Sequence, residues 1–132
     1  MTPARKSVRS TAAVITVGTE LTSGLRHDTN GPEIAARLES LGITVVLIAS
    51  VPDDVDRISH AIGEAIAGCD LVIVTGGLGP THDDVTREAA ARAVGRPIER
   101  SSDVVAQLQR LATRHAEPES RTSMLRQADV IE

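Results

Sequence analysis

The sequence contains no phenylalanine, tyrosine or tryptophan among its 132 residues. A hydrophobic core must therefore come from valine, isoleucine, leucine and alanine, which account for most of the 41% of residues that are apolar. The same absence means that the flat ring of a bound ligand finds no aromatic side chain of this chain on which to stack. Recognition of such a ligand has to rely on backbone amides, carboxylates, hydroxyls and arginine.

Cysteine is almost as scarce, because Cys69 is the single example. One cysteine can form no disulfide within the chain and no cysteine-based metal cage. Cys69 stands two residues before an apolar run that starts at Leu71. We interpret it as a small buried residue rather than as a nucleophile.

Long apolar runs and an excess of positive charge are also missing. The net charge is −4 and the isoelectric point is about 5.5, so no basic stripe is available for nucleic acid. No segment reaches the length of a membrane span, and the basic N-terminal segment lacks the apolar run of a secretory signal. We predict a cytoplasmic protein with no nucleic-acid or membrane partner, and a disordered basic arm over residues 1–11.

Short apolar runs alternate with helical patterns over most of the chain. The apolar runs are residues 12–17, 43–51 and 71–75, and the helical patterns are residues 29–41, about 53–68 and 84–94. Nearly continuous aliphatic runs are typical of strands that are buried on both faces of a parallel sheet. The alternation therefore predicts an α/β fold with three layers, α/β/α, and a mostly parallel open sheet.

The pattern weakens toward the C-terminus. Residues 98–99 favour a short extended piece, residues 102–115 a helix, and residues 119–127 one more helix. Residues 128–131 have the composition of a strand that is beginning. We expect one domain over residues 12–132, and we expect that domain to be incomplete at its C-terminal end.

The third apolar run leads directly into a bend with three glycines. Glycines allow backbone amides to approach a ligand closely, and a helix that follows presents unpaired N–H groups and the positive end of its dipole. We therefore predict an anion site, most often for phosphate. The bend matches neither a nucleotriphosphatase loop nor G-x-G-x-x-G, and a plain turn between strand and helix is the alternative. The candidate phosphate-binding residues are Thr75, Gly76, Gly77, Gly79 and Thr81.

A second polar loop follows the first apolar run. Ligands of open α/β sheets bind at the carboxyl ends of the strands, where this loop and the glycine bend are expected to face one another. Gly18, Thr19, Glu20 and Ser23 are therefore candidates for contact with a phosphate or with the ring of the ligand. Hydroxyl residues after a strand are equally common as ordinary turn residues.

Two carboxylates stand at strand ends, Asp53 after the second run and Asp84 after the glycines. We expect them to converge, to hold Mg²⁺ and to act in catalysis, because Mg²⁺ favours carboxylates, waters and substrate phosphates. The alternative is that each caps a helix, with Asp54 as the other candidate beside Asp53 and Asp83 as the other beside Asp84.

Several segments resemble those of the MoaB/Mog molybdopterin-binding superfamily, and in particular the N-terminal domain of the CinA (competence/damage-inducible) family. The matching segments are Val17-Gly18-Thr19-Glu20-Leu21, Gly24 through Asp28-Thr29-Asn30, Val51-Pro52-Asp53-Asp54, residues 75–86 and Arg126-Gln127-Ala128. The resemblance implies a three-layer α/β domain that binds a pterin or nucleotide phosphate at its strand-end loops. The two aspartates that matter in the adenylyltransferases of the superfamily fall on Asp53 and Asp84.

Three functional hypotheses follow from this resemblance. The first is a CinA-type domain that binds a nucleotide or pterin phosphate with Mg²⁺ and hydrolyses a nucleotide pyrophosphate such as ADP-ribose. The second is a molybdopterin adenylyltransferase of molybdenum cofactor biosynthesis. The third is a catalytically incomplete binding or assembly module. We expect the chain to form a dimer or trimer, since an incomplete sheet leaves apolar surface to be covered.

Overall fold

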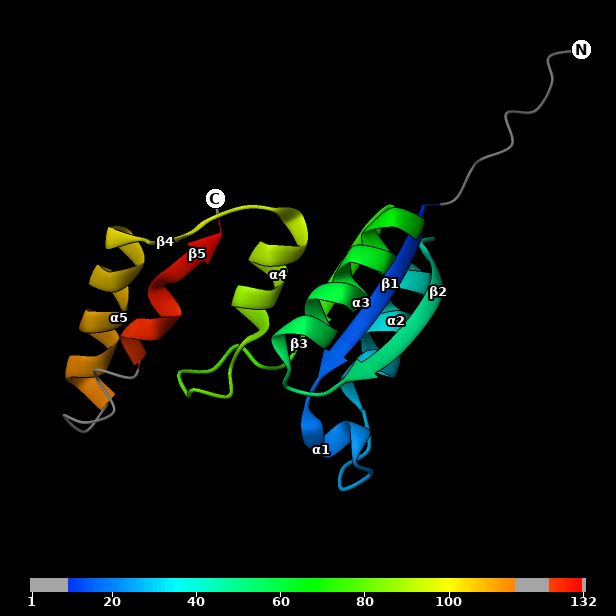
Figure 1. Cartoon of the computed structure of the whole chain (residues 1–132). Helices are drawn as coiled ribbons and strands as arrows, with labels where there is room; N and C mark the ends of the chain where they lie inside the picture. Colours follow the sequence, from blue (N-terminus) through cyan, green and yellow to red (C-terminus); the bar gives the residue numbers. More distant parts are fainter. Residues whose placement is uncertain (1–9, 116–123, 132) are drawn as a thin grey trace, which may run out of the picture.

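The computed structural model describes residues 10–115 and 124–131. Most of the predicted basic arm and residues 119–123 of the predicted last helix lie outside this part of the chain. Figure 1 shows a sheet packed with helices and a smaller group of elements beyond α4 (Thr86–Val94). Within the described residues, no helix has the length and apolar character needed to cross a membrane.

Three parallel strands form the main sheet, in the order β2-β1-β3. They are β1 (Thr11–Val17), β2 (Thr44–Val51) and β3 (Leu71–Thr75). The central strand β1 is buried over Ala12 to Val17, which confirms the prediction from its nearly continuous apolar run. In the register of the sheet, Thr16 lies opposite both Ser50 and Thr75. The three strands therefore end together, and their exit loops meet at one edge.

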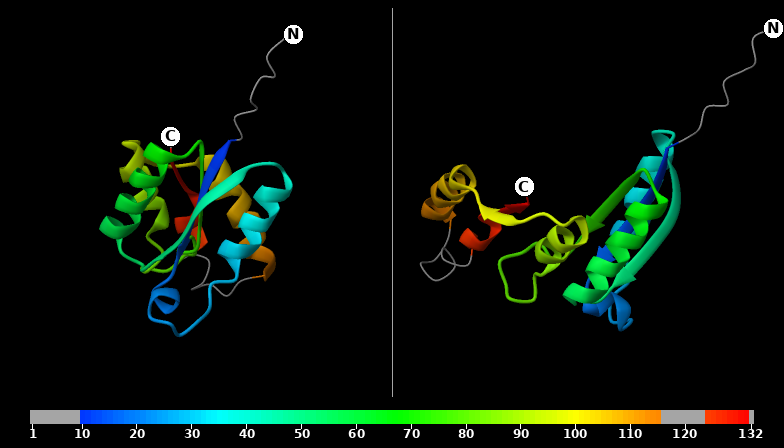
Figure 2. Two further views of the ribbon diagram at one scale, coloured as in Figure 1. Left: turned by 90° about the vertical axis from the view of Figure 1, so that its right-hand side faces the viewer. Right: turned by 45° about the horizontal axis from the view of Figure 1, so that its top comes forward.

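Helices cover both faces of this sheet. The side chains of β1 alternate between the faces, as the two-residue period of a strand requires. Ala12 and Val14 pack with Leu38 of α2 (Asn30–Ser40). Ala13, Ile15 and Val17 pack on the other face with α3 (Val55–Gly68) and with α4. The left view of Figure 2 shows the sheet between these two layers, which confirms the three-layer α/β/α prediction.

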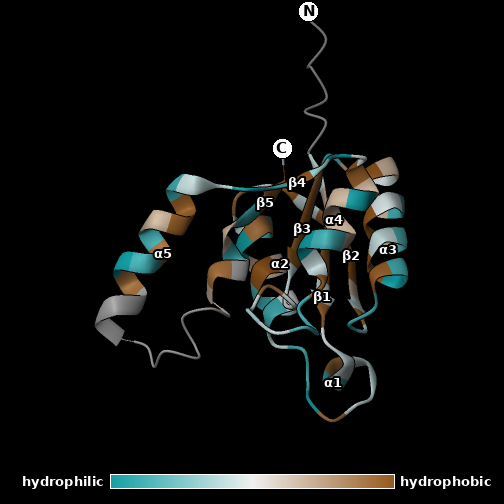
Figure 3. Cartoon of the chain, turned by 60° about the vertical axis from the view of Figure 1, so that its left-hand side comes forward, coloured by the Kyte–Doolittle hydropathy of each residue, from teal (hydrophilic) through white to brown (hydrophobic). Residues whose placement is uncertain are grey.

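Hydrophobic residues concentrate on the strands and on the inner sides of the helices, while the outer sides are hydrophilic (Figure 3). In α3 the buried residues are Ile58, Ile62 and Ala65, at helical spacing. Ile66, which was expected on the same inner side, is 46% exposed. Cys69 is half-buried and packs against the core on this side, which agrees with its interpretation as a small packing residue.

The starts of α3 and α4 decide which aspartates are helix caps. Asp54 caps α3, because its Oδ1 accepts a hydrogen bond of 2.9 Å from the backbone N–H of Arg57. The cap position of α4 is Val85, with no side-chain cap bond, so neither Asp83 nor Asp84 is its cap. The helix begins two residues later than predicted because Asp84 bonds to the loop before it rather than to the helix.

The C-terminal residues form a separate group. Its elements are β4 (Ile98–Arg100), α5 (Ser102–His115), the 3-10 helix η1 (Leu125–Ala128) and β5 (Asp129–Ile131). The predicted strand at residues 128–131 is confirmed, and it pairs antiparallel with β4. The described part of the predicted last helix is the short turn η1. Arg87 joins the group to α4, since its Nη1 donates to the carbonyl of Asp129 at 3.2 Å.

Candidate functional site

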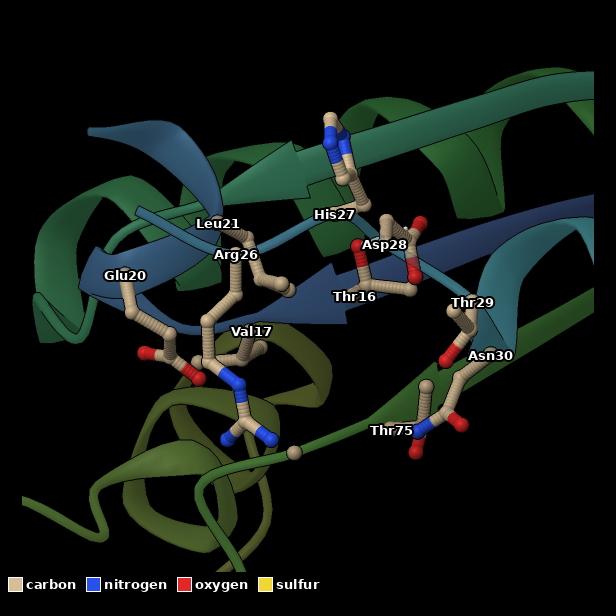
Figure 4. Close-up of a pocket in the computed structure, with 11 residues that line it drawn as sticks. Thr16, Val17, Glu20, Leu21, Arg26, His27, Asp28, Thr29, Asn30 and Thr75 are labelled. Atoms are coloured by element: carbon tan, nitrogen blue, oxygen red, sulfur yellow. Dashed lines mark hydrogen bonds between the residues drawn. The ribbon is translucent and has the colours of Figure 1, made fainter. Parts of the chain in front are cut away.

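A polar pocket of about 490 Å³ opens at the carboxyl edge of the sheet, and we call it the strand-end pocket. It is formed by the ends of β1 and β3, by the short helix α1 (Thr19–Thr22) and by the segment that leads to α2. Its lining includes Glu20, Arg26, Asp28, Thr75 and Gly76 (Figure 4). The prediction that the loops after the first and third strands face one another is confirmed at this pocket.

Gly76 closes the pocket at the end of β3. Its φ is +93°, and a Cβ at this position would lie 2.1 Å from the carbonyl oxygen of Val17. Only glycine combines this left-handed backbone with such a close approach to a neighbouring strand. The exits of β1 and β3 are therefore held against one another, and the backbone of Gly76 is left in the wall of the pocket.

Thr86 fastens the glycine bend to the first residue of α4, a role that sequence reasoning missed. Its hydroxyl donates to the carbonyl of Gly76 at 2.7 Å, and its backbone N–H donates to the carbonyl of Gly77 at 3.2 Å. Thr86 is only 2% exposed, and a Cβ on Gly77 would lie 2.3 Å from its hydroxyl. Gly77 is thus needed for packing against Thr86, and it does not line the pocket. A threonine at the start of an apolar helical pattern is the sequence signal that could have found Thr86.

Asp28 is a second residue that sequence reasoning missed as part of the site. Its Oδ2 accepts a hydrogen bond of 3.0 Å from the hydroxyl of Thr16, and its Oδ1 accepts one of 3.0 Å from the N–H of Gly31 at the start of α2. The Thr16 hydroxyl lies 2.8 Å from that of Ser50. This network ties the segment between α1 and α2 to β1 and β2. Its sequence signal is an aspartate three residues before a backbone N–H of the first helical turn.

Asp53 lies at the end of β2 and holds the start of α1. Its Oδ2 accepts hydrogen bonds from the N–H and the hydroxyl of Thr19, at 2.8 and 3.0 Å. Its own N–H donates to the Thr19 hydroxyl at 3.2 Å. Ser23 bonds locally as well, to the carbonyl of Glu20 at 3.3 Å. The hydroxyls of Thr19 and Ser23 therefore support the wall of the strand-end pocket, and neither residue lines it.

Asp84 is the centre of a second, smaller pocket of about 210 Å³, the glycine-loop pocket, whose lining includes Gly79, Thr81 and Asp129. Its Oδ2 accepts from the hydroxyl and the N–H of Thr81, at 2.5 and 2.7 Å. The Thr81 hydroxyl holds the pKa of Asp84 below its ordinary value, against the opposing effect of burial. The N–H groups of Thr81 and Gly79 and the charge of Arg87 lower this pKa further. Asp84 is therefore ionised at neutral pH.

The predicted site residues fall into three groups, of which one lines neither pocket and consists of Gly18, Thr19, Ser23, Asp53 and Gly77. Glu20, Thr75 and Gly76 line the strand-end pocket, whereas Gly79, Thr81 and Asp84 line the glycine-loop pocket. Asp53 lines neither of these two pockets. The two aspartates follow the two strands that flank β1, Asp53 after β2 and Asp84 after β3, and each has one oxygen engaged by a threonine.

The sequence model of a family described as "Probable molybdopterin binding domain" matches residues 13–127. The chain belongs to this family. A "CinA-like protein" of Citrifermentans bemidjiense is 51% identical to this molybdopterin-binding domain over 102 residues, which cover 77% of this chain and 25% of that protein. A "CinA-like protein" of Fervidobacterium nodosum is 40% identical over 123 residues, covering 92% of this chain and 29% of that protein. The chain thus spans between a quarter and a third of the length of these relatives.

Solved structures support the same assignment. The crystal structure of "the protein CinA with unknown function" from Thermoplasma acidophilum superposes with a TM-score of 0.83 at 33% identity, over 93% of this chain and 71% of that chain. The "tungsten cofactor synthesizing protein MoaB" from Pyrococcus furiosus superposes with a TM-score of 0.60 at 30% identity, over 81% of this chain and 64% of that chain. The molybdopterin-binding domain therefore lies in the MoaB/Mog superfamily, close to CinA, as the sequence motifs predict.

Proposed function

We propose that the domain binds a nucleotide or pterin phosphate in the strand-end pocket and, with Mg²⁺, hydrolyses a nucleotide pyrophosphate such as ADP-ribose. The observation that carries this proposal is the pocket itself, where the exits of β1 and β3 are locked together at Gly76 and lined by polar side chains. Ligands of open α/β sheets bind at this edge. The relatives named CinA-like support the CinA side of the superfamily for this chain.

The donor set at this edge fits Mg²⁺. The ion is usually held by one or two carboxylates together with waters and substrate phosphates. Asp84 is ionised at neutral pH and is half-buried beside the glycine bend, and Asp53 follows β2 on the other side of β1 at the same edge. We propose that Asp84, with Asp53 as the second carboxylate, would hold the ion. When bound, Mg²⁺ would neutralise negative charge on the phosphoryl oxygens.

The reaction requires one water and no redox partner. Water adds to one phosphorus of ADP-ribose, the bond from that phosphorus to the bridging oxygen breaks, and AMP and a ribose phosphate leave. The chain's own contribution is to place the pyrophosphate against the glycine bend, with the carboxylates of Asp84 and Asp53 at the same edge of the sheet. Positioning and electrostatic stabilisation account for most of the catalysis in phosphoryl transfer.

The test is to incubate the protein with ADP-ribose and Mg²⁺ beside Asp84→Ala and a matched control, Asp103→Ala. Asp103 is an exposed residue in the first turn of α5, far from the sheet edge. We expect release of AMP by the wild type and by Asp103→Ala. We expect a loss of about a hundredfold in Asp84→Ala, the usual effect of removing one group that stabilises a transition state. Equal turnover in the wild type and Asp84→Ala would remove the proposed role of Asp84.

The likeness to the tungsten cofactor synthesizing MoaB favours one second candidate, adenylyl transfer to molybdopterin. The products separate the two reactions. Adenylyl transfer yields an adenylylated pterin from ATP, whereas hydrolysis yields AMP and a sugar phosphate. The expected dimer or trimer and the cytoplasmic location stay predictions.

A further inference from the structure

We propose that Arg26 is the phosphate-binding side chain of the strand-end pocket, with its guanidinium bound to phosphoryl oxygens of the ligand. This inference rests on the proposed function only in that the pocket takes a phosphate ester. It names a residue that was not among the predicted site residues, and it assigns recognition of the ligand's negative charge to the guanidinium of this residue.

The backbone on both sides of Arg26 is fixed. Its own N–H donates to the carbonyl of Glu20 at 3.0 Å, which anchors it to α1. Two residues later, Asp28 is bonded to the Thr16 hydroxyl of β1 and to the N–H of Gly31. Figure 4 shows the Arg26 side chain extending across the pocket, with its guanidinium at the end that faces the glycine bend. The side chain is therefore presented by a rigid segment.

Among the described residues, Arg26 is the one lysine or arginine in the lining of this pocket. Within residues 10–115 and 124–131, no hydrogen bond or ion pair uses its guanidinium. Other arginines differ in this respect, since Arg92 pairs with Asp56 and Arg100 with Asp129. A guanidinium carries five N–H donors in a planar fork that matches phosphate oxygens. The guanidinium of Arg26 thus lies in the pocket with its N–H donors not hydrogen-bonded within the described residues.

Neither carboxylate of the described pocket lining, Asp28 or Glu20, pairs with Arg26 in the way that a bound anion would. Both oxygens of Asp28 already accept hydrogen bonds, from Thr16 and Gly31. The Glu20 carboxylate lies over the backbone of Gly18, where a Cβ would be 2.8 Å from each of its oxygens. Glu20 forms no ion pair with Arg26 within the described residues. A phosphoryl group beside Glu20 would be repelled, so the guanidinium of Arg26 is the group of the lining that makes phosphate binding favourable.

The experiment is calorimetric titration of the whole chain with ADP-ribose, with inorganic pyrophosphate and with uncharged adenosine, all without Mg²⁺. The variants are Arg26→Gln, Arg26→Lys and the control Arg57→Gln, an exposed arginine of α3 outside the pocket lining. We expect Arg26→Gln to weaken binding of both anions about tenfold, the size of a lost hydrogen bond to a charged group. The affinity of Arg26→Lys should lie between those of the wild type and Arg26→Gln, because lysine keeps the charge and loses the planar fork of donors. Arg57→Gln should bind like the wild type.

A salt series provides a readout that a merely structural role would not change. Wild-type affinity for pyrophosphate should fall as salt rises, and Arg26→Gln should show a flatter dependence, because one charge pair has been removed. Unchanged anion binding in Arg26→Gln would overturn the inference about Arg26, whether or not the wild type hydrolyses ADP-ribose. Weakened anion binding in Arg26→Gln, together with a wild type that does not hydrolyse ADP-ribose, would uphold Arg26 and contradict the proposed reaction alone. A wild type that binds neither anion would overturn the inference about Arg26, and release of AMP in the presence of Mg²⁺ would decide the proposed reaction separately.

Discussion

The two edges of the parallel sheet use the same pattern of hydrogen bonds, an aspartate that accepts from a threonine, and the strand-end pocket lies at the carboxyl edge. At the amino edge, Asp70 accepts from the N–H and the hydroxyl of Thr11, at 2.8 and 3.1 Å. At the carboxyl edge, Asp53 accepts from the N–H and the hydroxyl of Thr19, at 2.8 and 3.0 Å. Both pairs join an end of β1 to the segment at the end of an adjacent strand, β3 for Asp70 and β2 for Asp53. The hydrogen bonds of an aspartate therefore do not reveal whether it serves structure or function, whereas the surface beside it does.

The glycines of the two edges differ in the space around them. Gly42, before β2 at the amino edge, has φ +81° and nothing within 4 Å of an added Cβ. Gly76, at the carboxyl edge, has φ +93° and the Val17 carbonyl oxygen 2.1 Å from that position. The amino edge needs glycine only to reverse the chain. The carboxyl edge needs it to bring two strand exits together around the pocket.

The largest expected effect comes from exchanging these glycines for alanine. Gly76→Ala places a methyl group against backbone that cannot move aside, so we expect the free energy of unfolding to fall by about 3 kcal/mol or more. Gly42→Ala adds only the cost of a left-handed alanine, about 1 kcal/mol. Urea denaturation measures the free energy of unfolding of both variants. Equal losses would contradict the assignment of a crowded carboxyl edge.

The next largest effect distinguishes Asp53 from Asp70, which accept the same pair of hydrogen bonds from a threonine at opposite edges of the sheet. Asp53→Asn loosens the start of α1, whose Glu20 lines the strand-end pocket, so we expect affinity for ADP-ribose to fall about fivefold, a little less than the loss of one hydrogen bond to a charged group. Asp70→Asn changes the far edge and should leave this affinity within about twofold, as for substitutions distant from a site. Calorimetric titration distinguishes the two variants. An equal loss of affinity in both would mean that these hydrogen bonds act through the whole sheet.

The sequence was sufficient to predict the sheet, because short aliphatic runs such as those of β1 and β3 are typical of parallel strands. Of these two strands, only β1 is buried, since β3 lies at the edge of the sheet and is partly exposed. It also predicted that Glu20 and Gly76 meet, since parallel strands end at one edge. It could not place Asp84, because the ten residues between β3 and α4 carry it to the glycine-loop pocket beside Asp129. The path of such a loop depends on contacts with β5, which no local pattern encodes.

The roles of Asp28, Arg26 and Thr86 were missed for a related reason. The partners of Asp28 and Thr86 are the Thr16 hydroxyl and the Gly76 carbonyl, which lie 12 and 10 residues away in the chain. The register of the strands, rather than any local spacing, brings these groups together. Arg26 has no spacing signal of its own, and its place in the pocket follows only from the two bonded segments beside it.

A smaller effect concerns acid stability. The Thr11 N–H and hydroxyl hold the pKa of Asp70 below its ordinary value, and the Thr81 hydroxyl does the same for Asp84. A carboxylate with a lowered pKa stabilises the fold above its unfolded pKa of about 4, and this contribution is lost as the pH falls through the folded pKa. Asp70→Asn and Asp84→Asn should each reduce the loss of stability below about pH 4.

Urea midpoints measured at pH 7, 4 and 3 check this prediction for both variants. An acid dependence that matches the wild type in both would show that these two carboxylates titrate alike in the folded and unfolded chain.

The smallest effect is expected at the outer side of β2 near the amino edge. There the Glu39 carboxylate accepts a hydrogen bond of 2.8 Å from the N–H of Val45. This bond is exposed, so Glu39→Ala should lower the free energy of unfolding by about 0.5 kcal/mol, without changing the affinity for ADP-ribose. Thermal denaturation and calorimetry check the two quantities. A measurable loss of affinity would show that the two edges are coupled.

The central claim is that the ligand binds at the carboxyl edge, between Arg26 and the glycine bend. The most direct test is a titration of the ¹⁵N-labelled protein with ADP-ribose, followed by the backbone amide signals of its NMR spectrum. We predict that the signals of Glu20, Arg26 and Gly76 shift progressively, while those of Gly42 and Asp70 stay in place. Shifts that gather at Gly42 and Asp70, with Arg26 and Gly76 unmoved, would contradict the claim.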